Sequence, residues 1–318
     1  MQWDERIGRR IKLRDLHILL AVAQTGSMSR AAARLGISHP VVSKTIADLE
    51  RVLAVRLLDR TPQGVEPTAY GRALLSCGTT VFDELRRTVQ EIAFLSDPTV
   101  GELRVGSGAP YIDGILPAVI TRLDERYPRV RFRVTETDAV TLCGMLRDRK
   151  LDLVVGRVQA PLLGEDLISE DLFDERMHVV AGLDNPWTRR RKVRLSELVT
   201  EPWLMPESDN IAMALISEAF RSAGLEVPTP HVISNSMTFR IRLIETGRFI
   251  GILPESTLKF AGRRLHAKIL PVALSMLSPP TVAISLKNRT PNPISKLFAD
   301  EIRAAVKERR TFLDRAPP

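Results

Sequence analysis

A short segment near the amino terminus carries side chains suited to reading nucleic acid. Between residues 39 and 52 the sequence favours a helix, because apolar residues recur every three or four positions. The opposite face carries hydroxyl, imidazole and cationic groups, with small side chains near its start. Such a hydrophilic, net-basic face fits the major groove of DNA. The predicted buried stripe is Val42, Ile46, Leu49 and Leu53, and the opposite face has His39, Pro40, Ser43, Lys44, Ala47 and Arg51.

No pattern of catalytic or metal-binding residues emerges from the sequence. We find no P-loop, nucleophile elbow or dinucleotide fingerprint. Cys77 and Cys143 are too few for a disulfide framework, and we expect both to be reduced structural thiols. No partner at metal-ligand spacing accompanies His17, His178, His231 or His266. The sequence therefore favours a binding protein over an enzyme, with no catalytic residue, no cofactor and no metal site.

The helix over residues 39–52 needs other helices to position it, and the preceding sequence predicts two. An apolar face begins at Leu13, and Gly26 ends that helix. Ser27 is then expected to cap a helix over residues 28–35, whose small alanines allow a close approach to another helix. Residues 36–38 form a tight turn in which Gly36 is left-handed, Ile37 enters the core and Ser38 caps the next helix. The pattern is that of a helix-turn-helix.

A two-stranded wing is predicted directly after these helices, over residues 57–60 and 65–67. Arg60 and the backbone amides of this wing are placed to meet DNA phosphates. Residues 1–72 carry 12 Lys+Arg against 7 Asp+Glu, whereas the other 246 residues carry 34 against 31. A basic DNA-binding module on a nearly neutral sensing module has this distribution, although a solvated basic surface has it too.

The segment over residues 26–71 resembles the amino-terminal domain of LysR-type transcriptional regulators. The resemblance implies a winged helix-turn-helix over residues 1–71 that binds double-stranded DNA at a promoter operator. It also implies that Ser38, His39, Pro40, Ser43 and Lys44 approach base edges, and that Arg30, Arg34 and Arg60 lie near the backbone. The matching residues are Gly26, Ser27, Ala31, Ala32, Leu35, Ser38, Pro40, Ser43, Ile46, Leu49, Glu50, Leu57, Arg60, Gly64, Thr68 and Gly71.

Two residues depart from the family pattern within this segment. The family usually has glutamine where this chain has His39, and glycine where it has Ala54. Histidine can donate to a base acceptor or accept from an amino group, but its reach and protonation differ from those of glutamine. The departure at His39 affects which operator bases are read and leaves the choice of groove unchanged.

A long helix is predicted over residues 68–95, followed by a hinge at residues 96–98. No proline interrupts the helix, and Leu74, Val81, Leu85, Ile92 and Leu95 follow a heptad-like spacing. A lone helix of this length cannot bury such a stripe, so it needs a partner. Packing on the chain's own second module is one possibility. The resemblance favours the other, an antiparallel helix dimer within a homodimer or homotetramer.

Beyond the hinge, predicted strands and helices alternate, which indicates parallel β/α units. Two units are expected, residues 99–175 with 271–318, and residues 176–270. They resemble the effector domain of LysR-type regulators, two α/β subdomains like those of periplasmic binding proteins, through the motifs LRVG, KLDLVVG and GILP. The fold class is thus α/β overall, with a winged helix-turn-helix, a linker helix and an effector domain. The predicted strands are 102–106, 130–136, 151–156, 177–181, 203–205, 231–233, 249–253 and 281–286, and the predicted helices are 112–126, 140–147, 213–223, 238–246 and 293–309.

A small-molecule effector is expected between the two subdomains, at the carboxyl ends of their strands. Hydroxyls and helix-start amides in this wall suit a small carboxylate, although loop serines and threonines are more often helix caps. Aromatic-catabolism members of the family carry hydroxyl residues about where this chain has Pro110 and Ala139, which argues against a muconate-like ligand. Arg157, Arg240 and Arg242 could supply charge, but such arginines are commonly solvated. The candidate effector-binding residues are Ser107, Pro110, Thr137, Ala139, Ser208 and Ser236.

The composition of the 318-residue chain is that of an ordinary globular protein, with 44% hydrophobic and 26% charged residues. No apolar run is long enough for a transmembrane helix or a secretory signal, so we expect a cytoplasmic protein without a membrane partner. The leading interpretation is a transcription regulator that responds to a small anionic metabolite and contacts RNA polymerase. The alternatives are a regulator without an effector, a solute-binding protein, and an enzyme with a fused DNA-binding domain.

Overall fold

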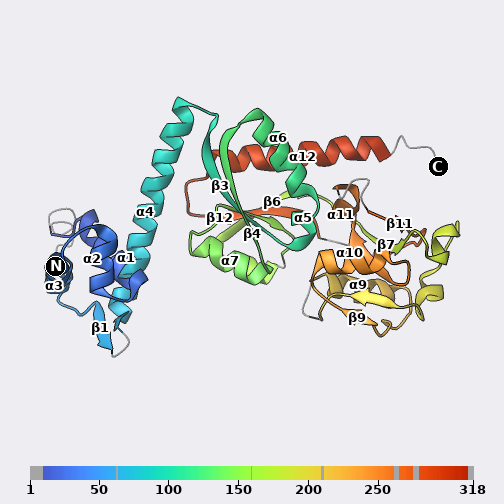
Figure 1. The fold of residues 1–318 in the computed structure, drawn as a ribbon, viewed down its shortest axis with the longest axis horizontal. Helices are drawn as coiled ribbons and strands as arrows, with labels where there is room; N and C mark the ends of the chain where they lie inside the picture. The colour runs from blue at the N-terminus through green and yellow to red at the C-terminus, as the bar shows by residue number, and fades with distance from the viewer. Residues whose placement is uncertain are drawn as a thin grey trace. The chain divides into compact units, whose positions relative to one another are not determined.

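The computed structural model describes residues 10–61, 64–158, 160–208, 211–260, 265–274 and 279–313. The chain forms two compact units, residues 1–89 and 90–318. The long helix α4 (Ala69–Ser96) runs through the boundary between them (Figure 1). Over the described ranges, no helix combines the length and the apolar character that a membrane span requires.

Three helices pack around one apolar core in the first unit. They are α1 (Leu13–Thr25), α2 (Met28–Leu35) and α3 (His39–Leu53), which lie where the apolar periodicity predicts them. Val22, Ala31 and Val42, one from each helix, are completely buried in this core. The small side chain at Ala31 lets α2 approach the other two helices closely.

The turns between these helices follow the expected chemistry except at one residue. Gly26 and Gly36 have φ angles of 62° and 65°, in the left-handed region that favours glycine. The Ser27 hydroxyl accepts a hydrogen bond from the backbone amide of Arg30 and so caps α2. Ser38 occupies the N-cap position of α3, but its hydroxyl makes no capping hydrogen bond. The expectation of a serine side-chain cap at this position is therefore wrong.

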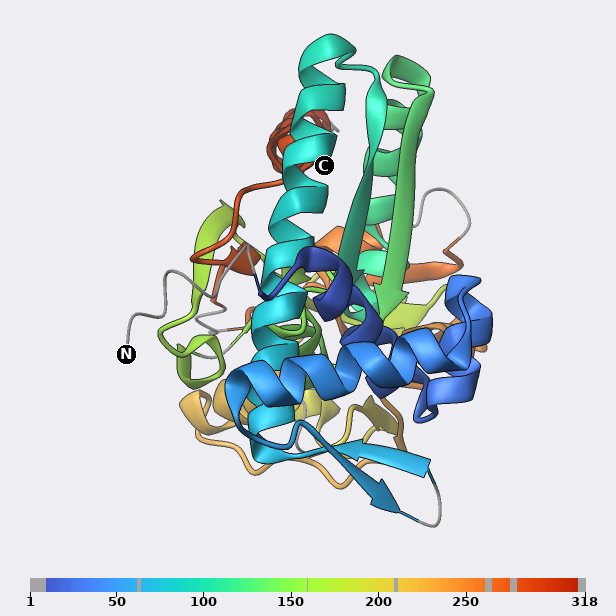
Figure 2. The ribbon, with the colours of Figure 1, turned by 90° about the vertical axis from the view of Figure 1, so that its left-hand side faces the viewer.

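The wing is an antiparallel pair of short strands, β1 (Leu58–Thr61) and β2 (Gly64–Pro67). Figure 2 shows this ribbon beside the three helices. The backbone amide of Val65 donates to the carbonyl of Gly26 at 3.0 Å, which ties β2 to the turn between α1 and α2. A Cβ atom at Gly64 would come within 2.3 Å of that same carbonyl oxygen. The close approach of the wing to the helices therefore requires glycine at this position.

The second unit contains two five-stranded sheets, which define two subdomains. The sheet of subdomain I has the strand order β4-β3-β5-β12-β6. Strands β3, β4 and β5 are parallel, whereas β12 is antiparallel to both of its neighbours. The strands are β3 (Val100–Ser107), β4 (Arg129–Glu136), β5 (Leu153–Gly156), β6 (Leu167–Phe173) and β12 (Thr281–Leu286).

Helices cover both faces of this first sheet. On one face, side chains of α5 (Ala109–Ile112), α6 (Ile115–Arg126) and α12 (Pro293–Leu313) form a core with β3, β4 and β5. On the other face, α7 (Ala139–Arg147) packs against β5, β6 and β12, and the short helix α8 (Ala160–Leu163) follows β5. Both faces are apolar because the buried strands alternate their side chains between two helical layers.

A buried carboxylate, Asp152, links the strands of subdomain I to the chain that follows β12. Its Oδ2 accepts hydrogen bonds from the backbone amide of Arg104 at 3.0 Å and from Nδ2 of Asn292 at 3.2 Å. Its Oδ1 lies 3.4 Å from Nη2 of Arg289 and accepts from the Arg104 guanidinium. A buried charge is tolerated when it is paired and hydrogen-bonded in this way.

The sheet of subdomain II has the strand order β11-β7-β10-β8-β9 and is also mixed. Strands β8, β9 and β10 are parallel, and β7 runs antiparallel between β10 and β11. Its strands are β7 (Met177–Gly182), β8 (Trp203–Met205), β9 (Val232–Ile233), β10 (Ile250–Pro254) and β11 (Ala267–Ile269). Its helices are α9 (Ile211–Ser222), α10 (Met237–Glu245), α11 (Glu255–Phe260) and the 3-10 helices η1 (Pro186–Arg189) and η2 (Leu195–Leu198).

The structure of the second unit departs from the expectations in several places. The sheets are mixed rather than parallel, because β7 and β12 run against their neighbours. The helix expected over residues 112–126 begins only at Ile115, since the backbone of Gly114 (φ −109°, ψ −105°) separates it from the short helix α5, which was not expected. Strand β6 was not expected, because the four residues Ile168–Asp171 at its centre are all exposed at the edge of the sheet and show no alternation.

Ala54 ends α3 in the left-handed region, with a φ angle of 57°. The left-handed conformation destabilises a residue with a Cβ atom by about 1–2 kcal/mol. Replacement by glycine removes this strain, but part of the gain in stability is lost because glycine has more conformational freedom in the unfolded chain. We therefore expect Ala54→Gly to raise the free energy of unfolding of the first unit by about 0.5–1 kcal/mol. Thermal and urea denaturation measure the effect. Ala47→Gly, in the interior of the same helix, is the control and is expected to destabilise by about 1 kcal/mol. Equal destabilisation by both changes would contradict the strain at Ala54.

Candidate functional site

The outer face of α3 is exposed and mostly polar, although Val41 is 37% exposed as well. Ser38, His39, Pro40 and Lys44 are exposed, and Ser43 is half-buried. On the opposite side Val42, Ile46 and Leu49 are each 2% exposed or less. The structure therefore brings the five residues expected at base edges together on the first two turns of one helix. Packing of the domain does not use their functional groups.

The three arginines expected near the DNA backbone lie on α2 and in the wing. Arg30 and Arg34 are exposed on α2, and Nη1 of Arg34 donates to Oε1 of Gln24 at 2.8 Å. That hydrogen bond links the Arg34 side chain on α2 to α1. The backbone of Arg60 belongs to β1, but its side chain lies outside the part of the chain that the structure describes.

Glu50 is a functional residue of this domain whose role the sequence pattern did not reveal. Its Oε1 accepts hydrogen bonds from the backbone amides of Leu57 at 2.8 Å and of Leu58 at 3.3 Å. These contacts join the end of α3 to the first strand of the wing. The match of Glu50 to the family motif was the available signal, but it gave no reason for a carboxylate at this position. The structure gives the reason: the Glu50 carboxylate fixes the position of the wing relative to α3.

The carboxyl ends of three parallel strands meet at one edge of subdomain I. In the sheet register Ser107 of β3 pairs with Glu136 of β4 and with Val155 of β5. Ser107 is completely buried, and its hydroxyl donates to the carbonyl of Val155 at 2.6 Å. Thr137 follows β4 at the same edge, and Ala139 begins α7, whose N-cap is Asp138. The Ser107 hydroxyl is therefore already hydrogen-bonded inside the sheet, whereas Thr137 and Ala139 are half-exposed.

The corresponding edge of subdomain II carries Ser208 and Ser236. Met205 of β8 pairs with Ile233 of β9, so the loops that follow these strands are neighbours. The backbone amide of Glu207 donates to Oδ1 of Asn235 at 3.1 Å, which joins the two loops. Both serines are exposed, and the Ser236 hydroxyl accepts from the amide of Phe239 as the N-cap of α10.

Two side-chain contacts bring these edges together. Oγ1 of Thr238 on α10 lies 3.1 Å from Oδ2 of Asp113, directly after α5. Oγ1 of Thr257 on α11 donates to the carbonyl of Pro110 at 3.0 Å. The candidate effector-binding residues thus flank a junction between α5 of subdomain I and α10 and α11 of subdomain II.

Buried polar groups that were not among the predicted site residues also lie at this junction. The Glu175 carboxylate accepts from the amide and the hydroxyl of Ser256 at 2.9 and 2.7 Å, while its burial raises its pKa. The hydroxyl of the buried Tyr111 lies 3.1 Å from that of Thr281, and burial likewise raises the pKa of this phenol. These groups fasten the segments that cross between the subdomains.

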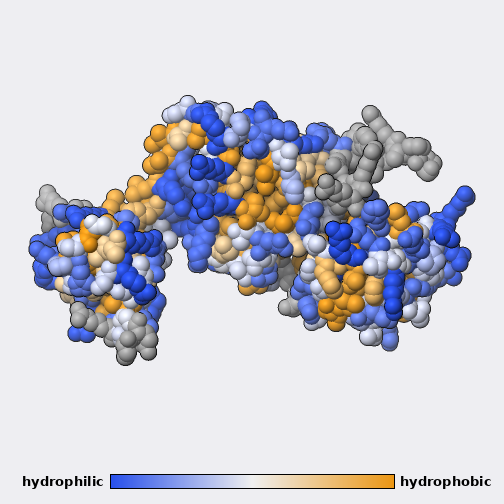
Figure 3. Space-filling view, viewed as in Figure 1, coloured by the Kyte–Doolittle hydropathy of each residue, from blue (hydrophilic) through white to orange (hydrophobic). Residues whose placement is uncertain are grey.

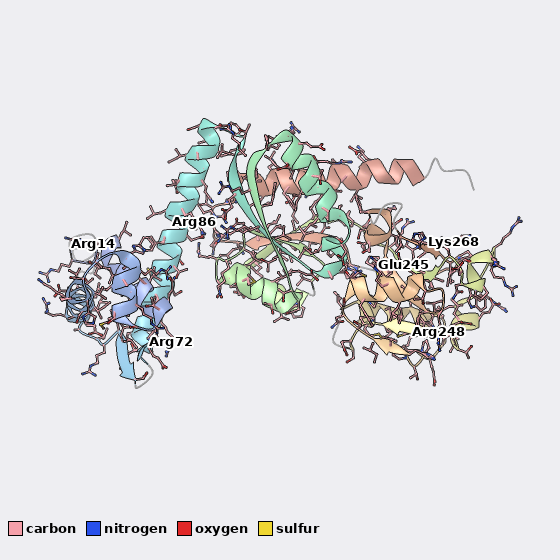
Figure 4. The ribbon with its side chains drawn as sticks, in the orientation of Figure 1. Arg14, Arg72, Arg86, Glu245, Arg248 and Lys268 are labelled. Carbon is pink, nitrogen blue, oxygen red and sulfur yellow. The ribbon has the colours of Figure 1, made fainter. Side chains whose placement is uncertain are left out.

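The arginines named as possible charge donors differ in burial. Arg157 and Arg240 are buried, with 7% and 5% of their surface exposed, so the expectation of solvated side chains is wrong for both. Arg242 is exposed and pairs with Glu245, which Figure 4 labels on α10. The available signal for Arg240 was its spacing of three residues from Met237 and four from Ile244, which places it on the apolar face of the helix.

The described residues contain no comparable evidence for a site that uses a cysteine, a metal ion or another hollow. Cys77 is exposed and Cys143 is buried, and both are free thiols. No three His, Cys, Asp or Glu side chains in the described ranges are grouped so that they could hold a metal ion. A hollow of about 290 Å³ lies between the end of β6 and α12, lined by residues such as Phe173 and Arg303. It contains none of the candidate effector-binding residues, and we assign it no role.

Fold and site together define a class of protein. A winged helix-turn-helix with an exposed polar recognition helix is a DNA-binding module. A pair of α/β subdomains joined by crossing segments is a ligand-binding module. Their combination in one chain is that of a DNA-binding transcription regulator.

Comparison with known proteins identifies the family. The model of the bacterial regulatory helix-turn-helix protein of the lysR family matches residues 13–72, and that of the LysR substrate binding domain matches residues 96–307. The uncharacterized HTH-type transcriptional regulator YdcI of Escherichia coli K12 is 26% identical over 272 residues, covering 86% of this chain and 88% of YdcI. The regulator GbpR of Azospirillum brasilense is 24% identical over 298 residues, covering 93% and 87%. The chain belongs to the LysR family of transcriptional regulators.

Solved structures confirm the fold class. A full-length OxyR variant from Pseudomonas aeruginosa superposes with a TM-score of 0.67 at 23% identity, covering 92% of this chain and 95% of OxyR. Full-length CbnR in complex with its target DNA gives a TM-score of 0.55 at 22% identity, covering 93% and 99%. The family carries regulators with a DNA-binding and an effector-binding domain, and it offers no evidence of catalysis in this chain.

We expect Lys44→Ala and Ser43→Ala each to weaken specific operator binding by about 1–3 kcal/mol, the usual worth of a good base contact. Neither residue is in the apolar core, so thermal stability should change little. Binding is measured at one fixed salt concentration, because phosphate contacts depend strongly on salt. Arg14→Ala is the control, since Arg14 is an exposed cation on α1 outside the proposed contact face (Figure 4). Unchanged operator affinity in both α3 variants would exclude this face.

Proposed function

We propose that this LysR-type regulator binds its operator through the outer face of α3, with the wing and the arginines of α2 on the DNA backbone. A small anionic metabolite binds between the subdomains of the effector domain and changes DNA geometry or transcription. The observation that carries the proposal is the junction at which the strand ends of both sheets meet beside α5 and α10. A ligand there touches both subdomains and so favours one of their arrangements over another.

The regulator is proposed to act as a homodimer or homotetramer joined through α4. Four large apolar side chains on this helix, Leu85, Val89, Ile92 and Leu95, are 45–76% exposed. Hydrophobic residues are visible along α4 in Figure 3. Leu85, Val89 and Ile92 are spaced at four and three residues, so they share one face, and a second α4 helix would bury it. Apolar surface of this kind marks an interaction site on a soluble protein.

We expect Leu85→Asp to dissociate the oligomer and to weaken operator binding, because a carboxylate cannot be buried unpaired in the apolar seam. Analytical ultracentrifugation at micromolar concentration measures the assembly. Thr79→Asp is the control, since Thr79 is exposed on α4 but lies about 120° around the helix from Leu85. Sedimentation of the wild-type protein as a monomer would refute the proposed assembly.

A thermal-shift screen of small organic acids tests the effector site. We expect at least one acid to raise the Tm of the wild-type protein. Ala139→Trp should abolish that increase, because the indole fills the space at the start of α7 without removing the Asp138 cap. Val140→Trp is the matched control, since Val140 is the next residue of the helix and is 62% exposed. Equal binding of the acid by Ala139→Trp and the wild type would place the site elsewhere.

A regulator of the same family without an effector is the second candidate function. Ser107 and Ser236 favour it, because both hydroxyls already make hydrogen bonds within the protein. In that case the junction fixes a single arrangement of the subdomains, and no acid alters operator binding. Contact with RNA polymerase follows from either candidate, because a transcription regulator bound at a promoter lies beside the enzyme.

A further inference from the structure

Arg240 is a buried cation on α10. It lies on the face that also carries Met237 and Ile244, which are 2% and 0% exposed, and Arg240 itself is 5% exposed. This face packs against the strands of subdomain II, whereas Arg242 lies on the opposite, exposed face of the same helix. Burial of an arginine is costly unless a partner compensates its charge.

The described residues supply no such partner. The Arg240 guanidinium contacts the sulfur of Met237 at 3.6 Å, and its Nε is buried without an acceptor. No carboxylate in the described ranges lies within 4 Å of it. The desolvation lowers the pKa of Arg240 to about 10, so the group still carries its charge at neutral pH. By contrast, the buried Arg289 of subdomain I lies beside Asp152.

Arg240 lies near the amino-terminal end of α10, the end that contacts subdomain I. It is one turn beyond the N-cap Ser236, and Thr238 between them contacts Asp113. Ala109 of α5 packs against the apolar cluster that contains Met237. Asp113 is exposed and engaged by Thr238, so it is not placed as the counter-charge of Arg240. The missing negative charge therefore has to come from outside the described protein.

We propose that Arg240 anchors the effector through the carboxylate of a small monoanionic acid. This inference rests on the proposed effector site and adds the class of its ligand. A planar guanidinium forms two parallel hydrogen bonds with a carboxylate, and one negative charge compensates the one positive charge. A phosphate dianion would leave an uncompensated charge in the same buried place. The amino-terminal end of α10 adds a favourable dipole for an anion.

The test compares full-length wild type with Arg240→Met, which removes the charge and keeps an unbranched stem. Without ligand, the variant should melt about 2–4 °C higher, since it no longer buries an unpaired charge. A merely structural arginine would lower the Tm when it is replaced. Arg242→Met is the matched control, because Arg242 is an exposed arginine on the same helix, and its Tm should match that of the wild type.

Sodium acetate is the probe for the anion, and sodium chloride at the same ionic strength is the reference. Acetate should raise the Tm of the wild type and of Arg242→Met relative to chloride, and it should leave that of Arg240→Met unchanged. Equal responses in all three proteins, or none in the wild type, would overturn the proposal. A larger response to inorganic phosphate than to acetate would overturn the carboxylate class. Loss of the acid response in Ala139→Trp together with a normal response in Arg240→Met would retain the effector site and reject its anchor.

Discussion

The effector domain depends on strand β12, and the buried carboxylate of Asp152 holds the chain that follows this strand. Arg104 belongs to β3, and Arg289 and Asn292 lie beyond β12, so a single side chain joins the beginning and the end of subdomain I. Strand β12 lies between β5 and β6, and the sheet is incomplete without it. The chain must therefore leave subdomain I, build subdomain II and return. This path creates the crossing segments and the junction at which a ligand can touch both subdomains.

The two modules use their polar groups in opposite ways. In the DNA-binding domain most of the groups proposed for recognition are exposed on α3, whereas Glu50 binds the backbone amides of Leu57 and Leu58 at the start of the wing. In the effector domain most polar groups at the junction are satisfied internally, as Ser107 and Glu175 show. Arg240, a buried cation with no carboxylate partner among the described residues, is the exception, and it is the residue that we propose as the anchor of the effector. Under that proposal an anion bound at Arg240 alters the interactions at the junction, and a change of this kind is what effector binding requires.

The sequence predicts local structure well and burial poorly. The recurrence of apolar residues every three or four positions located α1 to α4, and glycines at 26 and 36 located the turns. The break at Gly114 was missed, because apolar residues continue on both sides of it. Strand β6 was missed since an edge strand with polar residues has no periodic signal. Arg240 and Arg242 are the same residue type two positions apart, and the spacing of Arg240 from Met237 and Ile244 was the one signal in the sequence that distinguished the buried arginine from the exposed one. Helix caps were recognisable, but whether a serine is free for a ligand depends on partners far along the chain.

The position of β12 between β5 and β6 also has a consequence for biosynthesis. The DNA-binding domain is complete within the first 89 residues, so it can fold while the ribosome is still adding the rest of the chain. Subdomain II is complete before residue 281. Subdomain I, although its first strand is made early, has to wait for β12, which lies between β5 and β6, and for α12. During that interval β5 and β6 lack their shared neighbour, and their open edges are the place where a nascent chain is most exposed to mispairing.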